Sequence, residues 1–103
     1  MFGGKRYMTR GVAYDVPGEI VIFMWQKVDG LKLKSKGQMD YLQVFDLRRF
    51  KDINGDEYQL VIHRSEKPTY EQRYLVPTKD IYEGKVFVID SIDYCTMLLA
   101  KEY

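Results

Sequence analysis

The stretch VPGEIVIFMWQKVDGLKLKSK, residues 16–36, holds the densest apolar run of the chain and its only tryptophan. Pro17 suits the start of a helix, where its missing N–H is not needed, and Glu19 is favoured by the positive field of a first turn. Apolar side chains then recur at intervals of three and four residues: Ile20, Phe23, Met24, Val28 and Leu31. Because this spacing aligns them along one side of a helix, the sequence predicts a helix over residues 17–34 that buries the stripe.

Further apolar residues around Trp25 widen this stripe, so we expect the first two turns to be nearly enclosed and Trp25 to be buried. Gly30 costs a helix about 1 kcal/mol relative to alanine, and we expect fraying near it. A β-hairpin is the alternative, because residues 20–25 form a β-branched and aromatic run after the turn signal Pro17-Gly18. The apolar pattern continues well beyond this run, farther than most strands extend, and therefore favours the helix.

The composition indicates one domain in a reducing compartment. A chain of 103 residues that is 46% apolar and 15% aromatic can fill a core, so we expect a single domain over 1–103 with a flexible leader at 1–5. The net charge of +1 does not draw the protein to nucleic acid or to an anionic membrane. No apolar run approaches the ~18 residues of a membrane span, and no signal peptide is present. Together with the single cysteine, Cys95, these features predict a cytoplasmic protein that is not bound to a membrane.

The rest of the chain alternates between apolar and polar residues, as strands of a sheet do. Expected strands cover residues 6–14, 39–50, 57–64, 70–76 and 85–90, and residues 95–101 form either a strand or a short helix. Asn54-Gly55 is a strong hairpin signal between the second and third strands, and Pro68 marks the next reversal. The economical solution is an α+β fold in which one main helix packs on a mostly antiparallel sheet of five to six strands.

Five short segments together resemble one known family of proteins. They are RYMTRGV at 6–12, DYLQVF at 40–45, IHR at 62–64, PTY at 68–70 and TMLL at 96–99. The family consists of small uncharacterised proteins from low-GC Gram-positive bacteria, classed as a domain of unknown function, and the resemblance covers nearly the whole chain. It implies a cytosolic bacterial protein of this length and supports the helix over 17–34. The resemblance assigns no function to any residue of this chain.

Few residues of the types that carry catalysis are present. His63 is the only histidine, and no G-x-S-x-G motif supplies a nucleophile for it, so a histidine hydrogen-bonded on a sheet face or rim is the simpler interpretation. A small enzyme that uses His63 is the alternative. Cys95 stands near Asp93 and apolar residues, which favours buried packing over reactivity. The spacings of zinc and calcium ligands and of phosphate-binding glycines do not occur, so we expect no metal or cofactor.

Tyrosine and arginine residues gather in two parts of the chain, near residues 6–10 and 64–74. Both residue types concentrate contact energy in protein interfaces, and their alternate spacing lets several of them share one face. We therefore predict a non-catalytic protein-binding module whose interaction face is formed by Arg6, Tyr7, Arg10, Arg64, Tyr70, Arg73 and Tyr74. Single-stranded nucleic acid is the alternative ligand, because bases stack on tyrosines beside phosphate-binding arginines, although Glu66 and Glu71 oppose it. An unpaired edge strand would also allow a homodimer.

Overall fold

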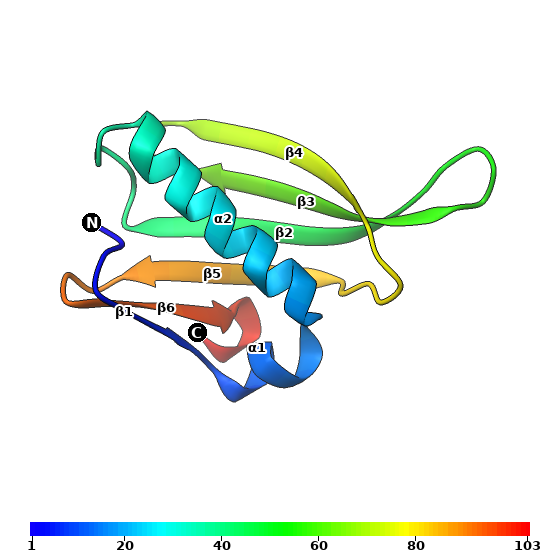
Figure 1. Ribbon diagram of the computed structural model, residues 1–103, viewed down its shortest axis with the longest axis horizontal. Coiled ribbons are helices and arrows are strands. Elements are labelled where there is room, and N and C mark those ends of the chain that lie inside the picture. The colour runs from blue at the N-terminus through cyan, green and yellow to red at the C-terminus, as the bar shows by residue number, and fades with distance from the viewer.

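Six strands and two α-helices follow one another in the computed structural model, which describes residues 1–103 (Figure 1). The strands are β1 (Lys5–Met8), β2 (Leu42–Lys51), β3 (Glu57–Ser65), β4 (Tyr70–Pro77), β5 (Gly84–Asp90) and β6 (Tyr94–Leu99). The helices are α1 (Arg10–Asp15) and α2 (Gly18–Lys34), and a short 3-10 turn, η1 (Ala100–Glu102), follows β6.

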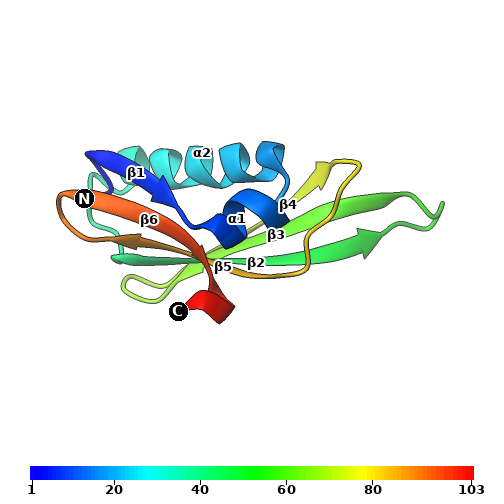
Figure 2. The same ribbon diagram turned by 90° about the horizontal axis from the view of Figure 1, so that it is seen from below.

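The strands form one sheet in the order β1-β6-β5-β2-β3-β4. All neighbouring strands are antiparallel except β1 and β6, which join the two ends of the chain in parallel. Helix α2 lies across one face of the sheet (Figure 2). The other face carries no helix and is called the open face below. The predicted α+β fold, with one main helix on a mostly antiparallel sheet, is confirmed.

Helix α2 buries the stripe that the sequence predicts. Its buried residues are Ile20, Val21, Met24, Val28 and Leu31. Glu19 lies in the first turn and two lysines lie in the last turn, where each charge opposes the helix dipole. Lys36 and Gly37 have φ values of +55° and +81°, and the N–H of Gly37 bonds to the carbonyl of Lys32, so the helix ends in a left-handed turn. The alternative hairpin over 20–25 is wrong.

The helix is less enclosed than predicted. Ile22 is 60% exposed, and Trp25 is only partly buried at the edge of the core. The reason is geometric, since the sheet touches one side of the helix and Trp25 faces the short edge strand β1. There the guanidinium of Arg6 lies over the indole ring, 4.6 Å from its centroid. Gly30 does not interrupt the helix, which continues to Lys34.

The strand predicted over 6–14 is wrong beyond Met8, because the chain turns into α1. Thr9 caps this helix, its Oγ1 accepting a hydrogen bond from the N–H of Val12 at 3.3 Å. Val12 and Val16 are buried in the core, whereas Tyr14 between them is 84% exposed, and this pattern fits a helical turn and not a strand, in which all three would share one face. The side chains of Glu102 and Leu99 pack closely against Gly11, since a Cβ there would lie 2.6 Å from Oε2 of Glu102 and 2.8 Å from Cδ1 of Leu99.

Both ends of the chain are tied to the sheet. Phe2, in the segment expected to be a flexible leader, is 1% exposed, and its N–H donates to Oδ1 of Asp90 at 3.1 Å. At the other end the strand interpretation of residues 95–101 is right as far as Leu99, after which η1 begins. Oε1 of Glu102 accepts hydrogen bonds from Oγ1 of Thr9 at 2.6 Å and from the N–H of Leu99 at 2.8 Å.

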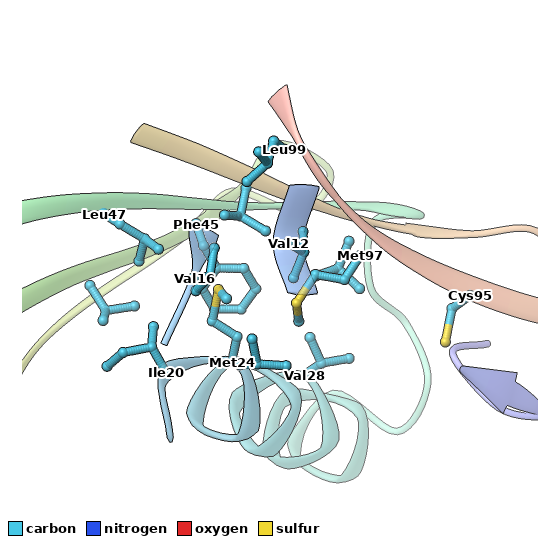
Figure 3. Packing of buried hydrophobic residues seen from close by; sticks show 14 of the residues in the cluster. Val12, Val16, Ile20, Met24, Val28, Phe45, Leu47, Cys95, Met97 and Leu99 are labelled. Carbon is cyan, nitrogen blue, oxygen red and sulfur yellow. The ribbon is translucent and has the colours of Figure 1, made fainter. Parts of the chain in front are cut away.

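The core lies between the helices and the covered face of the sheet (Figure 3). Ile20, Met24 and Val28 of α2 point toward the sheet, where they meet side chains of the central strands. The sheet contributes Phe45, Leu47, Val61, Val86, Val88, Cys95, Met97 and Leu99. Cys95 is fully buried, as predicted. The core thus uses alternate residues of the four inner strands β2, β3, β5 and β6 and leaves the residues between them to the open face.

Candidate functional site

The seven residues of the predicted interaction face do not lie together. Strands β1 and β4, which carry five of them, are the two opposite edges of the sheet. Because side chains alternate along each strand, the residues also divide between the two faces. Arg6, Tyr70 and Tyr74 are on the side of α2, Tyr7, Arg64 and Arg73 are on the open face, and Arg10 begins α1.

The three residues on the helix side serve the packing of α2. The ring of Tyr74 meets Phe23 edge to face at 5.4 Å, and the amine of Lys27 lies 4.4 Å from the centroid of Tyr74. Tyr70 is partly buried, and burial, followed by its hydrogen bond with Tyr74, raises its pKa to about 12. Arg6 pairs with Asp29 of the helix. These three side chains therefore make their contacts within the fold.

The open face carries an apolar strip that the interaction-face prediction missed. Register places Val44 of β2 beside Phe87 of β5, which pairs in turn with Leu98 of β6. The next row brings together Leu42 and Ile89. These five side chains, Leu42, Val44, Phe87, Ile89 and Leu98, are called the apolar strip. All five are partly exposed, so a continuous apolar surface over β2, β5 and β6 faces solvent.

A group of cationic residues lies next to the apolar strip and surrounds one buried carboxylate. Asp46 is 5% exposed and accepts hydrogen bonds from Arg48 at 2.8 Å and Arg64 at 3.2 Å. Lys85 is its register partner on β5. The hydrogen bond of Arg48 and the charges around it hold the pKa of the Asp46 carboxyl below its usual value. Arg73 stands one strand farther, opposite Ile62.

The cations of the open face outnumber its acids. Its strand residues include the cations Lys5, Arg48, Arg64, Arg73 and Lys85 and the carboxylates Asp46 and Glu71. The resulting charge of +3 compares with +1 for the whole chain, so positive charge is concentrated on this side. The open face therefore combines the apolar strip with cationic side chains, and Leu60 and Leu75 add apolar surface between the cations of β3 and β4.

A pocket of about 450 Å³ opens at the end of the apolar strip. It shares Leu42 and Val44 with the strip and is otherwise lined by Met1, Met39, Asp40, Tyr41, Ser65, Glu66 and Lys67. The Asp40 carboxylate accepts from the backbone N–H groups of Leu42, Glu66 and Lys67 at 3.0–3.3 Å. Burial alone would raise the pKa of Asp40, but these three bonds outweigh it and lower the pKa. Asp40 thereby holds the β3–β4 turn against the start of β2.

His63 lies on the covered face and not in a cleft. Its ring is fully buried, stacked on Phe45 at 4.3 Å, and its Nε2 is 2.7 Å from Oε1 of Gln43. Because the Gln43 amide nitrogen donates to the carbonyl of Asp40, its oxygen must accept the proton of His63 Nε2. Nδ1 has no partner. The prediction of a hydrogen-bonded histidine on a sheet face is confirmed.

Comparison with known proteins identifies relatives but no activity. The model of a family described as staphylococcal protein of unknown function (DUF960) matches residues 5–102. A crystal structure of a protein of unknown function from Enterococcus faecalis shares the fold with a TM-score of 0.77 and 26% identity, over 97% of this chain and 91% of that one. No curated protein matches the chain. Neither helix is long and apolar enough to cross a bilayer.

Proposed function

Because the chain belongs to the DUF960 family of staphylococcal proteins of unknown function, we propose a function from its surface alone. The protein is a non-catalytic cytoplasmic binding module, and its contact surface is the open face of the sheet. Its partner is another protein. Of the seven residues predicted from the sequence, Tyr7, Arg64 and Arg73 belong to this surface.

The observation that carries the proposal is the apolar strip beside the cationic residues. Protein interfaces combine an apolar centre with a polar rim and are rich in arginine. Here the strip supplies the centre, and Arg48, Arg64 and Lys85 supply the rim. A partner with aliphatic side chains flanked by carboxylates complements both the apolar strip and the cationic residues beside it. The pocket at Leu42 and Val44 gives such a partner a place to insert one side chain.

The chemistry of the strip favours protein over single-stranded nucleic acid. Binding of bases requires exposed aromatic rings on which they stack. Four of the five strip residues are aliphatic, and the fifth, Phe87, already meets Tyr103 edge to face at 5.6 Å. Tyr70 and Tyr74, which the nucleic-acid hypothesis needs, face α2. The strip itself thus offers no free ring on which a base can stack, and the exposed rings of Tyr7 and Tyr94 lie beyond it, at the β1–β6 edge, in contact with each other.

The geometry of His63 gives little support to the alternative hypothesis of a small enzyme that uses this residue. A general base needs an orienting acceptor and access to substrate. The ring is fully buried beneath α2, and its bonded nitrogen faces an amide instead of a carboxylate. Burial, and then the charge of Lys27, lowers its pKa to about 4. The imidazole is therefore neutral at physiological pH and hidden from solvent.

Point variants on the two faces test the proposal. We expect the wild-type protein to retain a specific partner from native cytosol at moderate salt, and we expect Val44→Lys and Lys85→Glu to lose it. Ile22→Lys and Lys34→Glu are the matched controls, since both residues are exposed on α2. Retention by all four variants would refute the open face as the contact surface. Binding of single-stranded oligonucleotides that weakens steeply with salt would favour nucleic acid instead.

A further inference from the structure

Strand β4 is an edge strand with one side unpaired. It is the last strand of the sheet, and Figure 1 shows no strand beyond it. It pairs with β3 in unbroken register from Tyr70 opposite Ser65 to Pro77 opposite Tyr58. The outward backbone N–H and C=O groups of its eight residues therefore have no partner in the sheet. The other edge strand, β1, has only four residues.

The devices that usually prevent edge strands from pairing are missing from β4. Such devices are lysines, prolines, bulges and very short strands. β4 has no lysine or bulge, and Pro77 stands at its very end. Its two charged residues, Glu71 and Arg73, have opposite signs and carry no net repulsion. The residues between Tyr70 and Tyr74 are exposed, so this edge is open to another strand.

Two antiparallel copies of β4 have complementary sequences. The segment Tyr70-Glu71-Gln72-Arg73-Tyr74 is symmetric in chemistry about Gln72, with an acid on one side, a base on the other and a tyrosine beyond each. Two antiparallel copies related by a two-fold axis at Gln72 place Glu71 of each copy opposite Arg73 of the other. The same axis places Tyr70 opposite Tyr74 on the helix side. Opposite charges and aromatic pairs directly across two strands are favourable.

We propose that β4 pairs with β4 of a second copy of this chain about this axis, joining two six-stranded sheets into one. A two-fold interface of this kind is closed, because each copy uses its only long edge. In the single chain, Arg73 and Glu71 pair only along their own strand, at 3.3 Å and largely exposed. Pairing across the axis gives each of them a second partner and satisfies the outward backbone groups.

Charge also selects the register of the two strands. A shift by two residues is the smallest that keeps every side chain on its own face. In one direction this shift places Glu71 opposite Glu71 of the other copy, and in the opposite direction it places Arg73 opposite Arg73. Like charges directly opposite each other are destabilising. The register centred on Gln72 is therefore the one in which both charges are paired.

A charge exchange tests the interface. We expect the mass measured by sedimentation equilibrium to rise with concentration from 12.2 kDa for one chain toward twice that value. Arg73→Glu places Glu71 opposite a glutamate at both ends, and this variant is expected to remain a monomer. The double variant Glu71→Arg, Arg73→Glu restores both pairs with exchanged signs and is expected to dimerise again. Far-UV circular dichroism of each variant confirms that it is folded.

Disulfide formation tests the register independently. In the proposed dimer, the two copies of Gln72 face each other, so Gln72→Cys is expected to cross-link under mild oxidation. Leu75→Cys is the matched control, because its two copies would stand six residues apart along the strands, about 20 Å. Wild type, whose only cysteine is the buried Cys95, is expected to remain uncross-linked. A wild-type monomer at every concentration, a dimer that tolerates Arg73→Glu, or equal cross-linking at both positions would overturn the proposal.

Discussion

Lowering the pH from 8 to 5 is expected to cost this fold about 2 kcal/mol through His63 alone. The buried ring has a pKa of about 4, against 6.5 for an unperturbed histidine. Between these values the unfolded chain binds a proton that the native chain does not, so stability is full above pH 6.5 and falls as the pH drops. Each unit in this window removes about 1.4 kcal/mol, which gives about 2 kcal/mol at pH 5.

The structure explains why the native ring resists protonation. A charged imidazole would need an acceptor at Nδ1, which has none, and it would lie near the ammonium of Lys27. Tyr70, which meets the ring edge to face at 5.1 Å, has its own pKa raised and stays neutral in this range. No carboxylate bonds to the ring to offset the charge. Below pH 4 the effect levels off, because both states are then protonated.

Urea denaturation at the two pH values, followed by the fluorescence of Trp25, measures the effect. The control is His63→Gln, which removes the titrating ring and keeps a polar side chain beside Gln43. Acidic residues that titrate at lower pH are the same in both proteins, so the difference between their pH dependences isolates His63. Equal losses of stability in the two proteins would contradict the argument and would mean that the native ring accepts a proton near pH 6.5.

Four further substitutions follow from packing, each measured by the free energy of unfolding in urea. Met24→Ala removes a fully buried side chain and should lower the free energy of unfolding by about 2–5 kcal/mol. Trp25→Ala should lower it by less than Met24→Ala does, because Trp25 is only partly buried. Phe2→Ala should cost about 3–5 kcal/mol, and no measurable loss would restore the interpretation of residues 1–5 as a free leader. Gly11→Ala should cost about 1–3 kcal/mol, because its Cβ would lie 2.8 Å from Cδ1 of the buried Leu99 as well as 2.6 Å from Oε2 of Glu102.

Where the local pattern is long, the sequence was sufficient to predict the fold. The α2 stripe extends over three turns, so its period is unambiguous, and Gly55 has the positive φ of +87° that the Asn54-Gly55 hairpin signal requires. The strand predicted over 6–14 is wrong for residues 9–14, because a six-residue helix is too short to show a period. What makes this segment helical is the cap at Thr9 and the burial of Val12 and Val16 against the sheet.

The candidate face depended on information that the sequence does not carry. The predicted face included both Arg73 and Tyr74, although adjacent residues of a strand point to opposite faces. Alternation did not show which strands are neighbours, and the order of the sheet places β1 beside β6 at the edge opposite β4. Nor did it show which face α2 covers. The apolar strip joins Val44, Phe87 and Leu98 from three strands, and only their register brings them together.

The parallel pairing of β1 with β6 has a consequence for synthesis on the ribosome. Lys5 pairs with Tyr94 and Met8 with Met97, so the first strand to emerge must wait for the last one. At 5–20 residues per second this delay is on the order of 10 s. During this time the α2 segment has been synthesised but lacks the complete sheet that covers its apolar stripe. The nascent chain therefore presents the apolar stripe of α2 without its complete cover until β5 and β6 have been synthesised, and closure of the sheet is a late event.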